Sequence, residues 1–262
     1  MVTFDCIQAQ LRASAQQNYE AVAAPPFTYF FNPDDPAPWS NYAIPDAPVA
    51  GDLMAPLTTF VDAFRTRDRL PRFEFIAEFA PQLAPALAAY GFVEEMRALL
   101  MVCTPATYQP VALIPDVTVV ELTDAAPLAA IQEFLTVQRR SFGNEDATTV
   151  SATEAQQFRD RFRTTRLFAA AVDGALVSAA CLQPPYEGVT EIAGIATLRL
   201  YRRQGIGTLV TAAAVQAAFA QGLEAVFLTA GSAEAGRVYE RVGFQTIGSG
   251  LAYSLPHEVI PL

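Results

Sequence analysis

The sequence predicts a mixed α/β fold (α+β, with a mixed sheet), and three observations favour this class. The chain has 262 residues, of which 52% are hydrophobic, so it can bury a substantial core. Prolines crowd residues 25–56, which excludes long helices and strands in that stretch. Beyond residue 116 the pattern becomes regular, and short β-type runs alternate with segments of helical periodicity.

The elements expected in the first half are few and short. Phe4, Ile7 and Leu11 begin a series at helical spacing, and Gly91 is placed to cap the end of a later helix. The expected elements are helices at 4–22, 57–64 and 83–90, a strand at 72–76 and a strand pair within 92–102. The intervening proline-rich chain is expected to be ordered but irregular.

Residues 104–115 hold three prolines between apolar segments and are the best candidate for a linker. Domain boundaries usually fall in exposed segments of this composition. We therefore expect two domains, a smaller covering domain at 1–110 and a larger domain at 115–262.

Turn and cap signals divide the second half into elements. Ser151 and Glu154 form a capping box, which begins a helix, and Asp173-Gly174 between two apolar runs is typical of a β-hairpin turn. Together with the hydrophobic periodicity, these signals give the order β-α-α-β-β-β-α-β-α-β-β. The expected strands are 117–122, 167–172, 176–182, 189–198, 225–229, 244–247 and 251–255, and the expected helices are 125–140, 151–163, 204–221 and 233–242.

The absence of lysine and the scarcity of histidine exclude several kinds of catalytic site. All 17 basic residues are arginine, which excludes Schiff-base catalysis, pyridoxal-phosphate attachment and a P-loop lysine. The single histidine, His257, lies near the C-terminal end, so a Ser-His-Asp or Cys-His triad is not expected. Cys6, Cys103 and Cys181 are odd in number and widely spaced, so neither a disulfide framework nor a metal site is predicted.

Charge and hydropathy exclude two classes of partner. A net charge of −10 disfavours nucleic acid, whose phosphates bind basic surfaces. No apolar run approaches the roughly 20 residues that cross a bilayer, so no membrane partner is expected. The first residues lack the basic start and apolar stretch of a secretory signal, and a cytoplasmic monomer or homodimer is expected.

A predicted strand leads into a glycine-containing turn that begins a helix. Unpaired N–H groups and positive partial charge at a helix start favour a diphosphate group there. Gly205 and Gly207 permit close approach of the backbone, and Arg202 and Arg203 add positive charge. The Rossmann fingerprint fails because Val210 stands at its third glycine position, which disfavours the alternative of a nucleotide-binding domain of another fold.

Two segments of the second half resemble the signatures of one family. Residues 202–207 read Arg-x-x-Gly-x-Gly, which is similar to the Arg/Gln-x-x-Gly-x-Gly/Ala motif of the GNAT superfamily of N-acetyltransferases. Residues 232–244 read Ser-x-x-Ala-x-x-x-Tyr-x-x-x-Gly-Phe and resemble that family's second signature, which usually begins with Asn. The resemblance covers roughly residues 117–255 and implies a GNAT acyl-CoA N-acyltransferase fold with an additional N-terminal GNAT-like domain.

The resemblance implies acetyl-CoA as cosubstrate and no metal. In the family, a bulge splays the fourth strand, and the free backbone groups of that strand hold the pantetheine arm. Here the N–H of Ile195 would polarise the thioester carbonyl, and the amides from Arg203 to Thr208 would bind the diphosphate. The implied cofactor-binding residues are Ile195, Ala196, Thr197, Arg202, Arg203, Gln204, Gly205, Ile206, Gly207, Thr208 and Ser232.

Two side chains stand where the family has catalytic groups. Glu191 matches the general base of some members, which takes a proton from the amine before attack. The alternative for Glu191 is a solvated glutamate near a strand end. Tyr239 matches the tyrosine that commonly protonates the departing thiolate, and the alternative is a core tyrosine with a hydrogen-bonded hydroxyl.

The first half shows an internal similarity to the second. Residues 72–92 and 225–244 share the order strand, helix and Gly-Phe, which suggests a degenerate second GNAT-like unit. The alternative is a glycine that merely ends a helix. Leu87 stands at the position of Tyr239 and no Arg-x-x-Gly-x-Gly occurs, so this half is expected to cover the sheet and not to bind CoA.

The resemblance implies transfer of an acetyl group from acetyl-CoA by direct attack of a primary amine of a small molecule, amino acid or peptide. A non-catalytic acyl-CoA-binding or regulatory protein on the same scaffold is the alternative. The loop at 139–146, the turn at 184–188 and the first half are expected to shape the acceptor pocket.

Overall fold

The computed structural model describes residues 2–123, 125–143 and 146–256, so His257 lies outside the described residues. The strands are β1 (Glu20–Ala24), β2 (Phe27–Phe31), β3 (Tyr42–Pro45), β4 (Arg72–Ile76), β5 (Val93–Cys103), β6 (Val117–Leu122), β7 (Arg166–Val172), β8 (Ala175–Leu182), β9 (Val189–Thr197), β10 (Ala225–Ala230) and β11 (Gln245–Ser254). The helices are α1 (Phe4–Asn18), α2 (Met54–Thr66), α3 (Leu83–Tyr90), α4 (Leu128–Phe142), α5 (Ala152–Arg161), α6 (Ile206–Ala220) and α7 (Ala233–Glu240), with short 3-10 turns at Pro38–Ser40 and Arg199–Tyr201.

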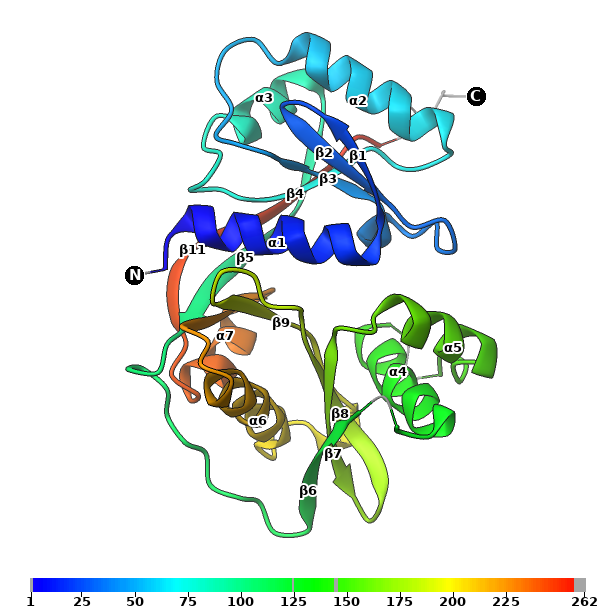
Figure 1. The fold of residues 1–262 in the computed structure, drawn as a ribbon, viewed down its shortest axis with the longest axis vertical. Coiled ribbons are helices and arrows are strands. Elements are labelled where there is room, and N and C mark those ends of the chain that lie inside the picture. Colours follow the sequence, from blue (N-terminus) through cyan, green and yellow to red (C-terminus); the bar gives the residue numbers. More distant parts are fainter. Residues whose placement is uncertain (1, 124, 144–145, 257–262) are drawn as a thin grey trace.

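All of these strands join one sheet, in the order β1-β2-β3-β4-β11-β5-β10-β9-β8-β7-β6 (Figure 1). The pairs β3–β4 and β9–β10 are parallel and the others are antiparallel. The mixed α/β class predicted from the sequence is therefore confirmed. No helix among the described residues is long and apolar enough to cross a membrane.

The centre of the sheet is built by strands from both halves of the chain. β11 lies between β4 and β5, while β5 lies between β11 and β10, and all three pairings are antiparallel. The succession β4-α3-β5 in the first half thus matches β10-α7-β11 in the second half. The last strand of each half lies beside strands of the other half: β5 pairs with β10 and β11, and β11 pairs with β4 and β5. This confirms the two-unit architecture that the internal similarity suggests.

The repeated Gly-Phe pairs have the same structural role. Gly91 is the C-cap of α3 and Gly243 lies in the turn that follows α7, with φ of 110° and 99°, a left-handed conformation that favours glycine. At Gly243 a Cβ would lie 2.0 Å from the carbonyl oxygen of Thr107, so the connecting chain itself excludes a side chain. Residues 104–116, which make this connection, contain no helix or strand. The boundaries 1–110 and 115–262 stay a prediction.

Several element predictions are wrong at their ends. The first helix ends at Asn18, because Tyr19 is extended and packs its ring edge-on against Tyr42, with the ring centroids 6.0 Å apart. The chain then forms β1, and β2 and β3 lie inside the proline-rich stretch. α2 begins earlier than predicted, at Met54, since Pro56 in its first turn needs no N–H partner.

The two predicted strand pairs are each a single strand. Residues 92–102 contribute only β5, and the predicted strands 244–247 and 251–255 are joined in β11. The pairing of β11 with β5 shifts register between Thr246 and Gly248, so the glycine there makes an irregularity within the strand and not a turn.

In the second half, successive side chains along each strand point to opposite faces of the sheet and form two separate cores. Phe168 and Ala170 on β7 belong to the core beneath α6, whereas Leu167 and Ala169 belong to the core beneath α4. Helices α6 and α7 thus cover one face, and α4 with α5 covers the other. The predicted capping box of α5 is present, with Ser151 and Glu154 bonded reciprocally.

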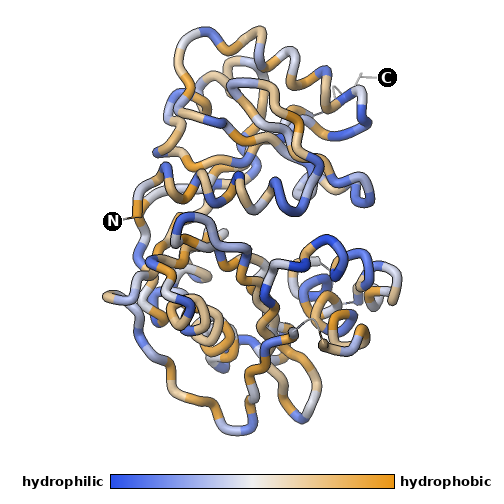
Figure 2. Tube along the Cα trace, in the orientation of Figure 1, coloured by the Kyte–Doolittle hydropathy of each residue, from blue (hydrophilic) through white to orange (hydrophobic). Residues whose placement is uncertain are grey.

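Helix α1 joins the two halves on the α4 face of the sheet. It contacts both β9 and β4, and Figure 1 shows it lying across the boundary between the halves. Its trace mixes hydrophilic and hydrophobic residues, as Figure 2 shows. The side chains buried on it include polar ones, which are Gln8, Gln10, Ser14 and Asn18.

Candidate active site

Strands β9 and β10 separate halfway along β9. Their parallel pairing runs only from Val189 to Glu191 on β9. Beyond that point β10 pairs with β5 alone, up to Ala230. Within the described residues, the β10-facing edge of β9 from 192 to 197 therefore has no neighbouring strand, and a wedge opens between the two strands.

A β-bulge bends β9 at the same place. Two steps along β8, from Ala179 to Cys181, correspond to three steps along β9, so β9 holds one extra residue. Gly194 lies there with φ of 62°, and the side-chain amide of Gln138 on α4 donates to its carbonyl oxygen at 2.8 Å. A Cβ on residue 194 would lie 2.4 Å from that amide nitrogen, so this bulge requires glycine.

The turn after β9 leaves consecutive backbone N–H groups free at the start of α6. In the part of the chain that the structure describes, the N–H groups from Arg203 to Thr208 donate no hydrogen bond, and the first bond runs from Leu209 N to Gly205 O at 3.0 Å. Arg203 and Gly205 adopt φ of 61° and 82°. Such a turn at a helix N-terminus forms an anion-binding cradle.

The two arginines of the motif have different roles. Arg202 donates from Nε to the carbonyl oxygen of Thr197 at 2.9 Å and from Nη2 to that of Ser141 at 3.1 Å, so it braces the turn against β9 and α4. Arg203 is exposed and pairs with no other described residue. Its guanidinium is therefore the positive charge available to a bound phosphate.

Three further predicted site residues form hydrogen bonds with neighbouring groups of the protein. Ser232 is the N-cap of α7, and its Oγ accepts from Ala235 N at 3.1 Å. Gln204 donates from Nε2 to a backbone carbonyl four residues earlier, at 3.0 Å. The carbonyl oxygen of Ala196 accepts from Ser178 Oγ at 2.7 Å. These bonds hold the shape of the turn and of β9.

Glu191 lies on the face of β9 opposite α6. Ile192 beside it is buried in the core beneath α6, so alternation turns Glu191 to the other face. The side chain is partly buried and makes no hydrogen bond or ion pair with another described residue. Burial, and next the charge of Glu74 on β4, raise the pKa of Glu191 to about 7.

Tyr239 is partly buried on α7. Its ring lies edge-on to Phe244, with the centroids 6.2 Å apart. The hydroxyl bonds to no other described residue, yet it is not one of the buried polar atoms that lack a partner, so it reaches solvent. Burial raises the pKa of Tyr239 to about 12, and the hydroxyl stays protonated at neutral pH.

The predicted cofactor-binding residues on β9 and α6 lie together. A Cβ on Gly207 would be 3.3 Å from Thr197 Oγ1 and 4.0 Å from Val238, the residue before Tyr239, so β9, α6 and α7 meet there. Gln138, Ser141 and Ser178 support this site from α4 and β8. Nothing in the motif signals them, because they reach it only through tertiary packing.

The corresponding helix start in the first half carries a carboxylate. Helix α2 follows β3 as α6 follows β9, but Asp52 accepts a hydrogen bond from Met54 N at 2.9 Å. Its carboxylate thus stands at the helix start, where it would repel an anion. Leu87, at the position of Tyr239, is fully buried in the core. Both features support the expectation that this half does not bind CoA.

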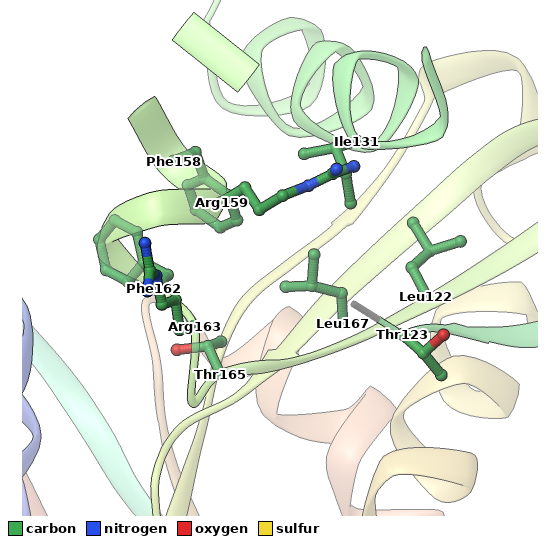
Figure 3. Close-up of a pocket in the computed structure, with 9 residues that line it drawn as sticks. All are labelled: Leu122, Thr123, Ile131, Phe158, Arg159, Phe162, Arg163, Thr165 and Leu167. Atoms are coloured by element: carbon green, nitrogen blue, oxygen red, sulfur yellow. The ribbon is translucent and has the colours of Figure 1, made fainter. Parts of the chain in front are cut away.

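A small pocket lies beneath α5, near the edge of the sheet (Figure 3). Its lining residues are Leu122, Thr123, Ile131, Phe158, Arg159, Phe162, Arg163, Thr165 and Leu167. None of them is a predicted site residue. Among the described residues, no group of His, Cys, Asp and Glu side chains is arranged to hold a metal ion.

Comparisons with known proteins give a family match and several similar folds. Residues 130–244 match the acetyltransferase (GNAT) family. The chain is similar in structure to a GCN5-related N-acetyltransferase from Kribbella flavida, with a TM-score of 0.80 and 24% identity over 99% of this chain and 98% of that chain.

Two other similar structures have lower identity. A tandem GNAT protein from the clavulanic acid biosynthesis pathway has a TM-score of 0.63 and 16% identity, over 88% of this chain and 79% of its own. A GCN5-related N-acetyltransferase from Sphaerobacter thermophilus has a TM-score of 0.63 and 12% identity, over 98% and 92%. These likenesses show a shared fold. A search of curated proteins finds no match.

Proposed function

Because this chain carries a domain of the GNAT acetyltransferase family at residues 130–244, within a fold of two GNAT-like units, we propose that it transfers an acetyl group from acetyl-CoA to a primary amine. The observation that carries the proposal is the row of free N–H groups at the start of α6, beside the open edge of β9. A diphosphate and an extended amide-containing arm fit these two features together.

The residues present fit the parts of acetyl-CoA. The N–H groups from Gly205 to Thr208, with the guanidinium of Arg203, bind the diphosphate at the positive end of α6. The backbone of residues 195–197 bonds to the amides of the pantetheine arm, as an added strand would. Gly205 adopts the positive φ of 82° that this turn needs, and Gly207 allows α6 to lie close to Thr197 of β9.

The reaction then needs a base, an oxyanion donor and an acid. Glu191 takes the proton from the ammonium group of the acceptor, directly or through water. The neutral nitrogen attacks the thioester carbonyl carbon, the C–N bond forms, and the Ile195 N–H stabilises the negative charge that develops on oxygen. As the C–S bond breaks, Tyr239 gives its proton to the thiolate, and the second proton of the attacking nitrogen passes through water to Tyr239, while the proton held by Glu191 is released to solvent. The products are an N-acetyl amine and free CoA, and one proton is released.

The direct test combines calorimetry with a thiol-release assay. We expect acetyl-CoA to bind, and thiol to be released when a suitable primary amine from a panel of small molecules, amino acids and peptides is added. Binding of acetyl-CoA without thiol release for any amine would contradict acetyl transfer and favour a sensor.

Tyr239→Phe is expected to lower kcat at pH 7 by at least about tenfold, because the thiolate loses its proton donor while the ring and its packing stay. The KM for acetyl-CoA should stay within about twofold. Tyr90→Phe is the matched control, since the hydroxyl of Tyr90 on α3 bonds, among the described residues, only to Thr58 on α2. Equal turnover of wild type and Tyr239→Phe would remove Tyr239 from the mechanism.

A further inference from the structure

The buried face of α1 carries hydrogen-bond acceptors that no described residue uses. Gln10 donates from Nε2 to the carbonyl oxygen of Pro184 at 3.0 Å, which fixes its amide orientation and leaves Oε1 buried without a partner. Oδ1 of Asn18 is also buried without a partner. Burying an unused acceptor costs free energy, so these atoms point to a ligand that donates hydrogen bonds.

Gln10 is bonded to the segment after β8, which is hydrogen-bonded to β9 at the predicted base. Gln183, the neighbour of Pro184, donates its backbone N–H to the carbonyl oxygen of Glu191 at 2.8 Å. The side chain of Gln183 also accepts from Ser14 Oγ on α1, at 3.4 Å. The polar face of α1 therefore contacts residues 183–184, the segment whose backbone is hydrogen-bonded to Glu191.

A second carboxylate, that of Glu74 on β4, faces the same side of the sheet. Its neighbour Phe73 packs against Phe60 of α2, with the ring centroids 4.3 Å apart, so alternation turns Glu74 to the opposite face. Ala15 of α1 packs on that opposite face, against Phe30. Helix α1 contacts both β4 and β9, so Glu74 and Glu191 both face the space on the side of the sheet that α1 covers, and the charge of Glu74 contributes to the raised pKa of Glu191.

Negative groups outnumber positive ones around this space. Arg72 is shared by Glu74 and Glu95, so one guanidinium serves two carboxylates. Arg161 at the end of α5 is already paired with Asp34. The charged groups that surround the space are Glu74, Glu95, Glu191, Asp34, Asp35, Arg72 and Arg161. Two tyrosines, Tyr19 and Tyr42, add neutral hydroxyls whose pKa is raised mainly by burial.

We propose that the acceptor is a diamine, with one nitrogen reacting at Glu191 and a second, protonated nitrogen held at Glu74 beneath α1. The proposal rests on the function proposed above. When Glu191 takes the proton of the reacting nitrogen, both of these groups become neutral. The charge of Glu74, which Arg72 only partly offsets, then remains for the second nitrogen, and Oε1 of Gln10 accepts a hydrogen bond from the diamine.

The test compares 1,4-diaminobutane with 1-aminobutane, which has the same chain length and a single nitrogen. Calorimetry with the CoA-saturated protein gives the affinity of each amine, and thiol release from acetyl-CoA gives kcat/KM. We expect the diamine to bind at least about tenfold more tightly and to have at least about tenfold higher kcat/KM. Equal values for the two amines would overturn the proposal.

Glu74→Gln should abolish this preference through KM, with kcat for the diamine within about twofold of wild type. Asp62→Asn, which removes an exposed carboxylate on α2, should keep the preference. An unchanged preference in Glu74→Gln would contradict the role of Glu74. The wild-type comparison needs no variant, so the diamine site stays testable if Glu74→Gln does not fold.

The two proposals fail in different ways. Tight diamine binding without thiol release would contradict acetyl transfer and support the diamine site. Thiol release with equal kcat/KM for both amines would support acetyl transfer and contradict the diamine site.

Discussion

Glu191→Gln is expected to lower kcat/KM for the amine at pH 8 by at least about 100-fold, because the glutamine cannot accept a proton. With a pKa of about 7, wild-type Glu191 is a far better proton acceptor than an ordinary glutamate, which ionises near pH 4.5. Activity of the wild type should rise as the pH rises through about 7, as the carboxylate forms. A pH–rate profile by thiol release should show this step in the wild type and not in the variant.

The same substitution has an expected effect on stability. A pKa above the ordinary value means that the folded state binds this proton more tightly than the unfolded state, so stability falls as the pH rises from about 4.5 to about 7. Thermal unfolding at pH 8 should therefore show Glu191→Gln more stable than wild type. Glu224→Gln, an exposed change just before β10, is the control. A variant with wild-type kcat/KM and the same pH step would exclude Glu191 as the base.

Gly205→Asp is expected to weaken acetyl-CoA binding by at least about 100-fold relative to Gly205→Asn. Asn and Asp tolerate the positive φ of 82° better than other side chains, and their Cβ atoms meet the same neighbour, Ile114, at 3.3 Å. The two variants differ by one negative charge at the start of α6, near the proposed diphosphate site. Like charges about 4 Å apart near a protein surface repel by about 4 kcal/mol, which exceeds the ~2.7 kcal/mol of a 100-fold change.

An acetyl donor that lacks the diphosphate serves as the control for this comparison. The thioester S-acetyl-N-acetylcysteamine keeps the reacting end of acetyl-CoA and lacks the part bound by α6. Both Gly205 variants should use it with similar kcat/KM. Equal affinity of the two variants for acetyl-CoA, measured by calorimetry, would show that the diphosphate does not lie at Gly205.

Local signals in the sequence predicted much of the second half. The capping box of α5 and the hairpin at Asp173-Gly174, whose φ values are 51° and 81°, depend on neighbouring residues only. The order of the strands could not be predicted in this way. The insertion of β11 between β4 and β5 depends on pairing between residues far apart in the chain, and no local pattern encodes it.

In the candidate site, too, the sequence predicted the local features but not those that depend on tertiary packing. The motif predicted the turn and its free N–H groups, because glycine spacing and helix periodicity determine them. It did not predict that Arg202 bonds to carbonyl oxygens of β9 and α4, since Ser141 is 61 residues away in the chain. Glu74 was missed for the same reason, because only the packing of α1 against both β4 and β9 relates it to Glu191.

A crystal structure with coenzyme A bound tests the central claim most directly, which is that the start of α6 binds the diphosphate while β9 aligns the thioester. We predict diphosphate oxygens within hydrogen-bonding distance of the backbone nitrogens from Gly205 to Thr208, and the pantetheine arm along residues 195–197. A diphosphate bound elsewhere on the molecule, without contact to these nitrogens, would contradict the proposed cosubstrate site.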